Sequence, residues 1–136
     1  HPQWNDNLAP IAELKTNITQ IHEIMKGETV GYNCGWRALE NTRIAVLPLG
    51  HADGLSRQYG HGKGAVMVHG KKAPIVGNVC MDMLMVDIGD IQCKEGDEVV
   101  IFGNGSRVDD LAENTGTISY ELLAALSNRI PRVIKK

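Results

Sequence analysis

Large aromatic side chains are scarce in this sequence, which has one Phe, two Trp and three Tyr among 136 residues, against 15 Gly. The composition therefore favours turns over large aromatic platforms. Neither sign of charge dominates, because 14 Lys and Arg stand against 16 Asp and Glu, a formal net charge of −2. Nucleic-acid-binding domains usually carry a basic stripe, so no nucleic-acid partner is expected.

Long apolar runs are missing as well. No run approaches the roughly 20 residues that cross a bilayer, and the start of the chain lacks the basic-then-apolar pattern of a secretory signal. The three cysteines, Cys34, Cys80 and Cys93, form no Cys-x-x-Cys pair, which disfavours a zinc ribbon or a redox motif. We therefore expect a cytoplasmic protein with reduced thiols and no membrane partner.

The length fits one domain. Residues 1–10 are polar, contain Pro2 and Pro10 and show no period, so we interpret them as a linker or the remnant of a preceding domain. Residues 11–136 would then form the domain itself, without internal repeats or low-complexity tracts.

Short apolar runs separated by glycine predict a mostly β domain, a barrel or a sandwich. Strands are expected at residues 44–49, 65–68, 73–81, 84–88, 98–102 and 130–134, with tight turns at 69–71 and 94–97. Residues 11–25 are ambiguous, because their apolar spacing fits a helix while their β-branched residues suit a strand. Pro48 and Pro74 should lie at edges, ends or bulges, since proline cannot donate to a ladder. Two short helices are expected at residues 108–113 and 117–128.

One segment combines a turn with a titratable side chain. Gly50-His51-Ala52-Asp53-Gly54 directly follows an apolar strand, and its glycines allow a sharp turn that presents His51 at the strand end. Histidine titrates near neutrality, which suits proton transfer. The alternative is an exposed loop histidine with Asp53 closing an Asx-turn, and spacing alone favours that alternative.

Other candidates carry weaker signals. In residues 78–83, Asn78 and Asp82 interrupt an apolar run, for a chemical reason or because Asp82 binds backbone amides at a bulge. Tyr120, in the first turn of the last expected helix, either packs in the core or points at an anion near the helix N-terminus. A metal site has four candidate ligands at no standard spacing: His51, Asp53, His61 and His69.

Several motifs, taken in order, resemble one family, the C-terminal domain of alanine racemases. They are Gly-Glu-Thr-Val-Gly-Tyr at 27–32, Pro-Leu-Gly-His-Ala-Asp-Gly at 48–54, Lys-Ala-Pro-Ile-Val-Gly at 72–77, Cys-Met-Asp at 80–82, Ile-Ser-Tyr-Glu at 118–121 and Arg-Ile-Pro-Arg-Val at 129–133. The resemblance runs from about residue 8 to the end. Because the motifs occur together and in order, it is more specific than any single motif.

The resemblance implies a mostly β fold, an alanine racemase C-terminal-domain-like β-barrel with one or two short helices, and it favours one long strand over residues 11–25. In this family the domain follows a (β/α)₈ barrel that carries pyridoxal 5′-phosphate. The enzymes are head-to-tail homodimers that interconvert L- and D-alanine for peptidoglycan synthesis. The implied partners are therefore alanine and the N-terminal barrels of the same and the partner subunit. The cofactor-binding lysine lies in the barrel, so this chain alone should be inactive.

The resemblance also implies three site residues. Racemisation needs an acid/base group on each face of the substrate, and the barrel lysine is one of them. Where the family pattern has a tyrosine in Gly-Tyr-Ala-Asp-Gly, this chain has His51, so we expect His51 to be the second group, as in similar racemases fused to a D-alanyl-D-alanine-adding cell-wall ligase. The backbone amide of Met81 should hold the substrate carboxylate across the dimer interface, and Tyr120 should hydrogen-bond the cofactor phosphate. Two alternatives stay open: a non-catalytic β-barrel docking module of a fusion protein, and a small metal-binding domain.

Overall fold

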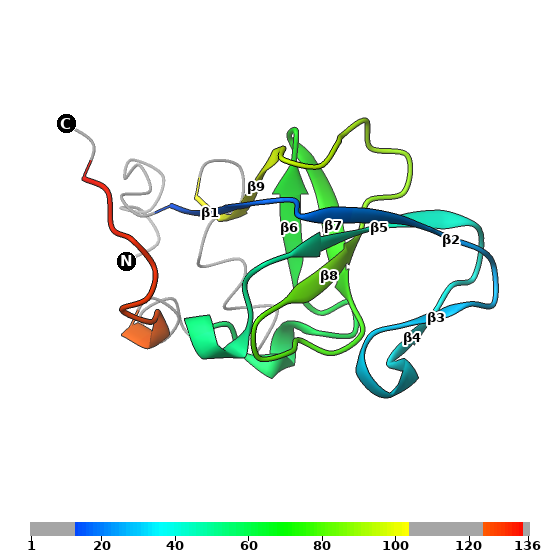
Figure 1. Cartoon of the computed structure of the whole chain (residues 1–136), viewed down its shortest axis with the longest axis horizontal. Helices are drawn as coiled ribbons and strands as arrows, with labels where there is room; N and C mark the ends of the chain where they lie inside the picture. Colours follow the sequence, from blue (N-terminus) through cyan, green and yellow to red (C-terminus); the bar gives the residue numbers. More distant parts are fainter. Residues whose placement is uncertain (1–12, 104–123, 135–136) are drawn as a thin grey trace, which may run out of the picture.

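The computed structural model describes residues 13–103 and 124–134, and most of its strands form one curled antiparallel sheet (Figure 1). Its strand order is β1-β9-β6-β7-β8-β5-β2. In chain order these strands are β1 Leu14–Asn17, β2 Gln20–Ile24, β5 Thr42–Leu47, β6 Ala65–Val68, β7 Lys71–Val76, β8 Leu84–Asp87 and β9 Glu98–Phe102. A two-stranded sheet of β3 (Thr29–Val30) and β4 (Trp36–Arg37) flanks the 3₁₀ turn η1 (Tyr32–Cys34).

The sheet curls because its two edge strands are almost continuous in sequence. β1 and β2 are separated by Ile18 and Thr19 alone. The Ile18 N–H donates to the Asp97 carbonyl and the Thr19 N–H to the Val46 carbonyl, each at 3.0 Å, so the chain leaves β9 and joins β5 within two residues. The prediction of one unbroken strand over residues 11–25 is therefore wrong: the chain changes partner at Ile18.

The inside of the curl is the hydrophobic core, and residue alternation explains it. In β8, Leu84 and Val86 are buried while Met85 and Asp87 are half-buried, as expected for a strand with one face inward. The strands contribute these fully buried side chains: Leu47, Val66, Val68, Ile75, Leu84, Val86, Val99 and Ile101. The predicted mostly β, barrel-like fold is thus confirmed.

The strand predicted at 73–81 ends earlier, at Val76. Gly77 adopts φ +65, which favours glycine, and leads into a loop over residues 77–83. Pro74 lies within β7, where it pairs with Ala65 of β6 on one side. On the other side β8 pairs with Ile75 and Val76 and not with Pro74, so β7 is locally an edge at Pro74, in line with the expectation. Pro48 directly follows β5, as predicted.

The hairpin turn between β6 and β7 is confirmed. His69 and Gly70 both have positive φ, 49° and 75°, the conformation of a two-residue turn that matches strand twist. The last predicted strand, 130–134, is wrong: these residues follow a turn as irregular chain, and Pro131 cannot donate to a ladder. Most of both predicted helices, and residues 1–10, lie outside the described residues.

Candidate active site

Two loops far apart in sequence are joined at one end of the sheet. The first is the 3₁₀ turn η2 (His51–Asp53), and the second is the loop of residues 77–83. The His51 N–H donates to the Cys80 carbonyl and the Ala52 N–H to the Met81 carbonyl, both at 2.9 Å. This pairing brings the predicted site residues His51 and Met81 to one place.

Gly50 makes the pairing possible. A Cβ at this position would lie 2.3 Å from the Cys80 carbonyl oxygen and 2.7 Å from that of Met81, which is closer than real Cβ atoms approach. The glycine preceding His51 is therefore required by close approach of two backbones, not by a left-handed conformation, since its φ is −153°.

Asp53 fixes the turn from inside. It is 5 % exposed, and its Oδ2 accepts a hydrogen bond from the Gly50 N–H at 2.9 Å. The Asp53 side chain thus binds the local backbone, as in the Asx-turn alternative, but its partner is Gly50, three residues earlier in the chain. The other carboxylate oxygen, Oδ1, lies 3.5 Å from Nη2 of Arg129 in the C-terminal segment. Asp82, for which binding to local amides was one of two alternatives, has an exposed side chain 3.9 Å from the same guanidinium.

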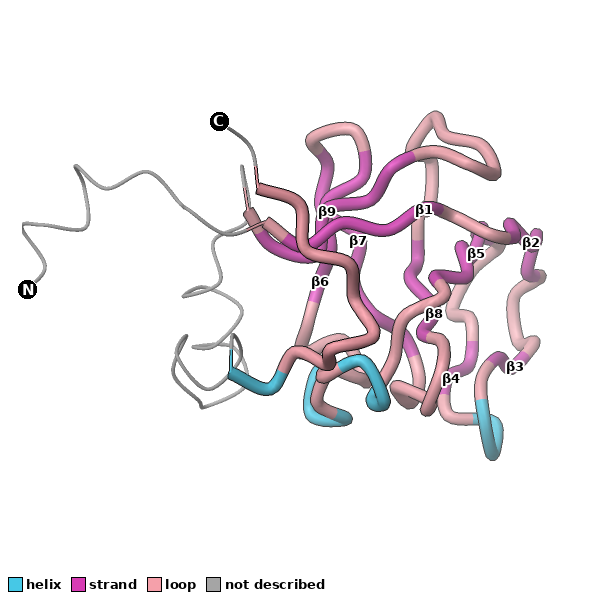
Figure 2. Tube along the Cα trace, turned by 60° about the vertical axis from the view of Figure 1, so that its left-hand side comes forward, coloured by secondary structure: helices cyan, strands magenta, loops and turns pink. Residues whose placement is uncertain are grey.

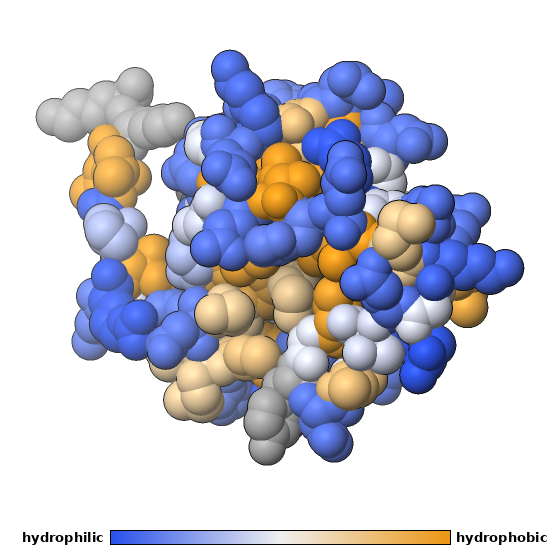
Figure 3. All heavy atoms as spheres, turned by 45° about the vertical axis from the view of Figure 1, so that its right-hand side comes forward, coloured by the Kyte–Doolittle hydropathy of each residue, from blue (hydrophilic) through white to orange (hydrophobic). Residues whose placement is uncertain are grey.

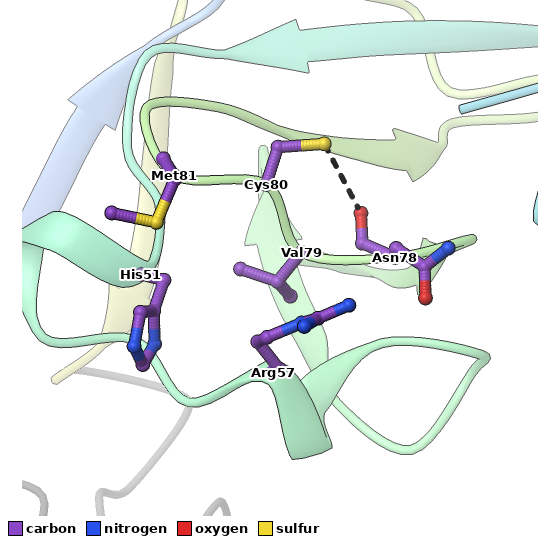
Figure 4. Close-up of a pocket in the computed structure, with 6 residues that line it drawn as sticks. All are labelled: His51, Arg57, Asn78, Val79, Cys80 and Met81. Atoms are coloured by element: carbon purple, nitrogen blue, oxygen red, sulfur yellow. Dashed lines mark hydrogen bonds between the residues drawn. The ribbon is translucent and has the colours of Figure 1, made fainter. Parts of the chain in front are cut away.

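A cavity of about 260 Å³ opens beside the paired loops. Figure 4 shows the side chains of His51, Val79 and Arg57 around one opening. Arg57 begins the 3₁₀ turn η3 (Arg57–Tyr59), and the remaining lining residues are Asn78, Cys80 and Met81. The volume is below the usual range for drug-sized ligands, so the cavity suits a small molecule.

His51 and Met81 are both exposed at this cavity. Met81 is 59 % and neighbouring Met83 45 % exposed, so two apolar side chains reach the surface beside the cavity. Figure 3 shows that hydrophobic side chains also reach the surface between polar ones on one face of the molecule. Among the described residues, none hydrogen-bonds the His51 ring.

The other candidate ligands are not assembled around a metal. His61 pairs with the Asn78 side chain at 2.9 Å and His69 with Asp97 at 2.8 Å, so each histidine has its own partner. Across residues 13–103 and 124–134 no group of three metal-binding side chains comes together. Tyr120 lies outside the described residues, so its expected contact with phosphate stays a prediction. In the same part of the chain, no helix has the length and apolar character needed to span a membrane.

The backbone of the η1 turn is unusual. The turn that starts at Tyr32 contains two non-glycine residues with positive φ, Asn33 at 57° and Cys34 at 51°. Backbone conformations of this kind cost free energy and cluster at functional sites. The Gly-Tyr pair at 31–32, inside a motif already used for the resemblance, was the signal that could have drawn attention to it.

The two short strands that flank η1 approach the loop beside the cavity. A Cβ on Gly77 would lie 3.6 Å from the Val30 carbonyl oxygen in β3 and 3.7 Å from Cβ of Trp36 in β4, and Gly77 directly precedes the lining residue Asn78. The β3–β4 sheet and the cavity are thus neighbours through Gly77.

Comparison with known proteins agrees with this arrangement. The family model described as "Alanine racemase, C-terminal domain" matches residues 11–134. This chain belongs to the alanine racemase C-terminal-domain family. Alanine racemase 1 of Clostridium acetobutylicum is 44 % identical over 135 residues, covering 96 % of this chain and 35 % of that protein. The chain thus spans about a third of the length of the curated racemases it matches.

Solved alanine racemases share the fold. The biosynthetic enzyme of Pseudomonas aeruginosa superimposes with a TM-score of 0.90 at 37 % identity, over 96 % of this chain and 36 % of that one. The Bartonella henselae enzyme, solved with covalently bound pyridoxal phosphate, gives 0.84 at 32 % identity, over 89 % and 34 %. The racemase domain fold of this chain is therefore established.

The described cavity fits a supporting role toward that cofactor. Its lining includes an imidazole and a guanidinium, from His51 and Arg57, which can face an anionic ligand. None of the described lining residues is a lysine, and Lys15, for example, is paired with Glu13 and Glu98 at 3.0 and 3.1 Å on β1. The residues present fit contact with a bound substrate or cofactor, but not covalent attachment of pyridoxal phosphate.

Proposed function

We propose that this chain acts as the C-terminal domain of a cytoplasmic, pyridoxal-phosphate-dependent alanine racemase, interconverting L- and D-alanine for cell-wall synthesis. In this proposal the domain is completed by an N-terminal barrel and faces the barrel of a partner subunit in a homodimer. The observation that carries it is the backbone pairing that puts His51 and Met81 together at an exposed cavity.

The domain's own groups would act on the substrate in two ways. The pairing with η2 uses the carbonyl of Met81, and no described residue accepts a hydrogen bond from the Met81 N–H, so that N–H can donate to the substrate carboxylate. A titratable group at the cavity would accept the α-proton on one face of alanine, or return one there. When bound, pyridoxal phosphate stabilises the charge left at the α-carbon. From this chain, Tyr120 would contact its phosphate.

Two residues compete for the acid/base role. His51 is supported by its place at the cavity, and histidine is the side chain that most often acts as a general acid or base. Against it, no described side chain orients its ring, whereas catalytic bases are usually oriented by a hydrogen-bond partner. Tyr32 is the second candidate, because it begins the η1 turn, whose flanking strands β3 and β4 approach Gly77 beside the cavity, and tyrosine is an acid/base residue type. We propose that one of these two performs the proton transfer.

Activity of the complete protein tests the function. Purified full-length protein supplied with pyridoxal phosphate should convert L-alanine into D-alanine, measured by chiral chromatography. A full-length protein that binds the cofactor but forms no D-alanine would contradict racemisation and favour a non-catalytic docking module.

A further inference from the structure

Arg129 lies where three segments meet. Figure 2 shows the C-terminal segment running beside the short helical turns near the site. From this segment, Nη2 of Arg129 lies 3.5 Å from Oδ1 of Asp53, and Nη1 lies 3.9 Å from Oδ1 of Asp82. Asp53 belongs to the His51 turn and Asp82 to the Met81 loop. One guanidinium therefore faces a carboxylate from each of the two paired loops.

The two carboxylates differ in burial. The Asp53 side chain is 7 % exposed, and a buried carboxylate is unfavourable unless it is paired and hydrogen-bonded. The Asp82 side chain is 74 % exposed, so its attraction to Arg129 contributes little to stability by itself. Arg129 is thus anchored on Asp53 and reaches outward to Asp82.

Backbone contacts hold the segment that carries Arg129 against the His51 turn. The Ser127 N–H donates to the Asp53 carbonyl at 3.0 Å, and the Arg129 N–H donates to Oγ of Ser127 at 3.1 Å. Gly54 approaches the same segment so closely that a Cβ there would lie 2.4 Å from the Ala125 carbonyl oxygen. The C-terminal segment therefore contacts the His51 turn at two residues that precede Arg129, Ala125 and Ser127.

We propose that Arg129 is a positioning residue that sets the spacing between the His51 turn and the Met81 loop. It acts through Asp53 and Asp82. Its planar guanidinium presents donors along several edges and can face two carboxylates at once, which the single ammonium of lysine does less well. The importance of this spacing for catalysis rests on the proposed function, whereas the spacing itself does not.

Three variants of the complete protein separate this role from general stabilisation. Arg129→Gln removes the charge, and Arg129→Lys keeps the charge but loses the planar fork. Arg132→Gln is the matched control, because Arg132 lies in the same segment but binds the carbonyls of Leu126, Ser127 and Ile130 instead of the two carboxylates.

Hydrogen exchange measures how often the two paired loops separate, because an amide exchanges when its hydrogen bond opens. Peptides covering residues 49–55 and 78–83 report the amides of the paired loops, including those of His51 and Ala52. We expect these amides to exchange about tenfold faster in Arg129→Gln, a factor that corresponds to about 1.4 kcal/mol. Their exchange should be intermediate in Arg129→Lys and unchanged in Arg132→Gln.

Turnover gives a second readout. We expect kcat for alanine to fall on the order of 10- to 100-fold in Arg129→Gln, since small displacements of positioned groups reduce rate strongly.

Two results would overturn the proposal: unchanged exchange of both peptides in Arg129→Gln, or equal acceleration in Arg132→Gln, which would indicate loosening of the whole segment. Unchanged kcat beside faster exchange would overturn its catalytic part. If the wild-type protein does not racemise alanine, the proposed function fails, and the exchange data alone still decide whether Arg129 sets the spacing.

Discussion

At the scale of single residues, Gly50 shows how a contact can dictate residue type. Its φ of −153° and ψ of −155° lie in extended space that other residues can adopt. What excludes a side chain is the pair of carbonyl oxygens from Cys80 and Met81, within 2.3 and 2.7 Å of an added Cβ. The sequence indicated a turn here, but nothing in it identified the loop that would pack against Gly50.

We expect Gly50→Ala to destabilise the domain by about 1–3 kcal/mol, because the added methyl must push two backbone segments apart. The matched control is Gly89→Ala, where no atom lies within 4 Å of the added Cβ and the cost comes from a φ of +48° alone. Urea unfolding of both variants gives the comparison. A Gly50→Ala cost no larger than that of Gly89→Ala would contradict the contact argument.

Site residues were predicted unevenly, for physical reasons. The exposure of His51 followed from its place between glycines after a strand, and the structure bears it out. The burial of Asp53 did not follow, because its partner Arg129 comes from the far end of the chain. Residue type and local spacing report on turns, whereas ion pairs between distant segments depend on how the sheet closes.

At the scale of elements, periodicity located most strands but not their breaks. The runs now seen as β5, β6, β8 and β9 were predicted within a few residues. The exchange of partners at Ile18 was missed, because β1 and β2 follow one apolar pattern. The exchange shows only in hydrogen bonds to distant segments, from Ile18 to Asp97 and from Thr19 to Val46. A local pattern cannot show which neighbour a strand has.

The turn before β9 and the β6–β7 hairpin turn are joined by a side-chain contact. Oδ2 of Asp97, in the turn before β9, lies 2.8 Å from Nε2 of His69 at the tip of the β6–β7 hairpin, and it accepts the Lys94 N–H at 3.0 Å. The hydrogen bond from His69, followed by that from the Lys94 backbone, lowers the pKa of Asp97.

A lowered pKa means that the stabilisation from Asp97 is present above the ordinary aspartate pKa of about 3.9 and is lost as the pH falls through the lower folded-state value. We therefore expect the urea midpoint of the wild-type protein to fall more steeply below about pH 4 than that of Asp97→Asn. Asp90→Asn, an exposed position in the turn after β8, is the control and should keep the wild-type slope. Equal slopes for the wild type and Asp97→Asn would contradict the assignment.

At the scale of the whole molecule, the chain spans about a third of the length of its curated relatives. None of the described residues that line the cavity is a lysine. We therefore expect the 136-residue chain alone neither to racemise alanine nor to retain pyridoxal phosphate. The expected contact from Tyr120 is one hydrogen bond, and even a charge-assisted bond contributes only about 1.5–3 kcal/mol. Incubation with the cofactor, gel filtration and absorbance spectroscopy measure retention, and stoichiometric cofactor on the isolated chain would contradict this prediction.

The central claim is that this domain supplies the acid/base group for one face of alanine. The direct test is solvent-deuterium incorporation at the α-carbon of L- and D-alanine, followed separately in the complete protein and in its His51→Ala and Tyr32→Phe variants. We expect one variant to lose exchange from one enantiomer by on the order of 10²- to 10⁴-fold while exchange from the other persists through the remaining base. Near-wild-type exchange from both enantiomers in both variants would contradict the claim.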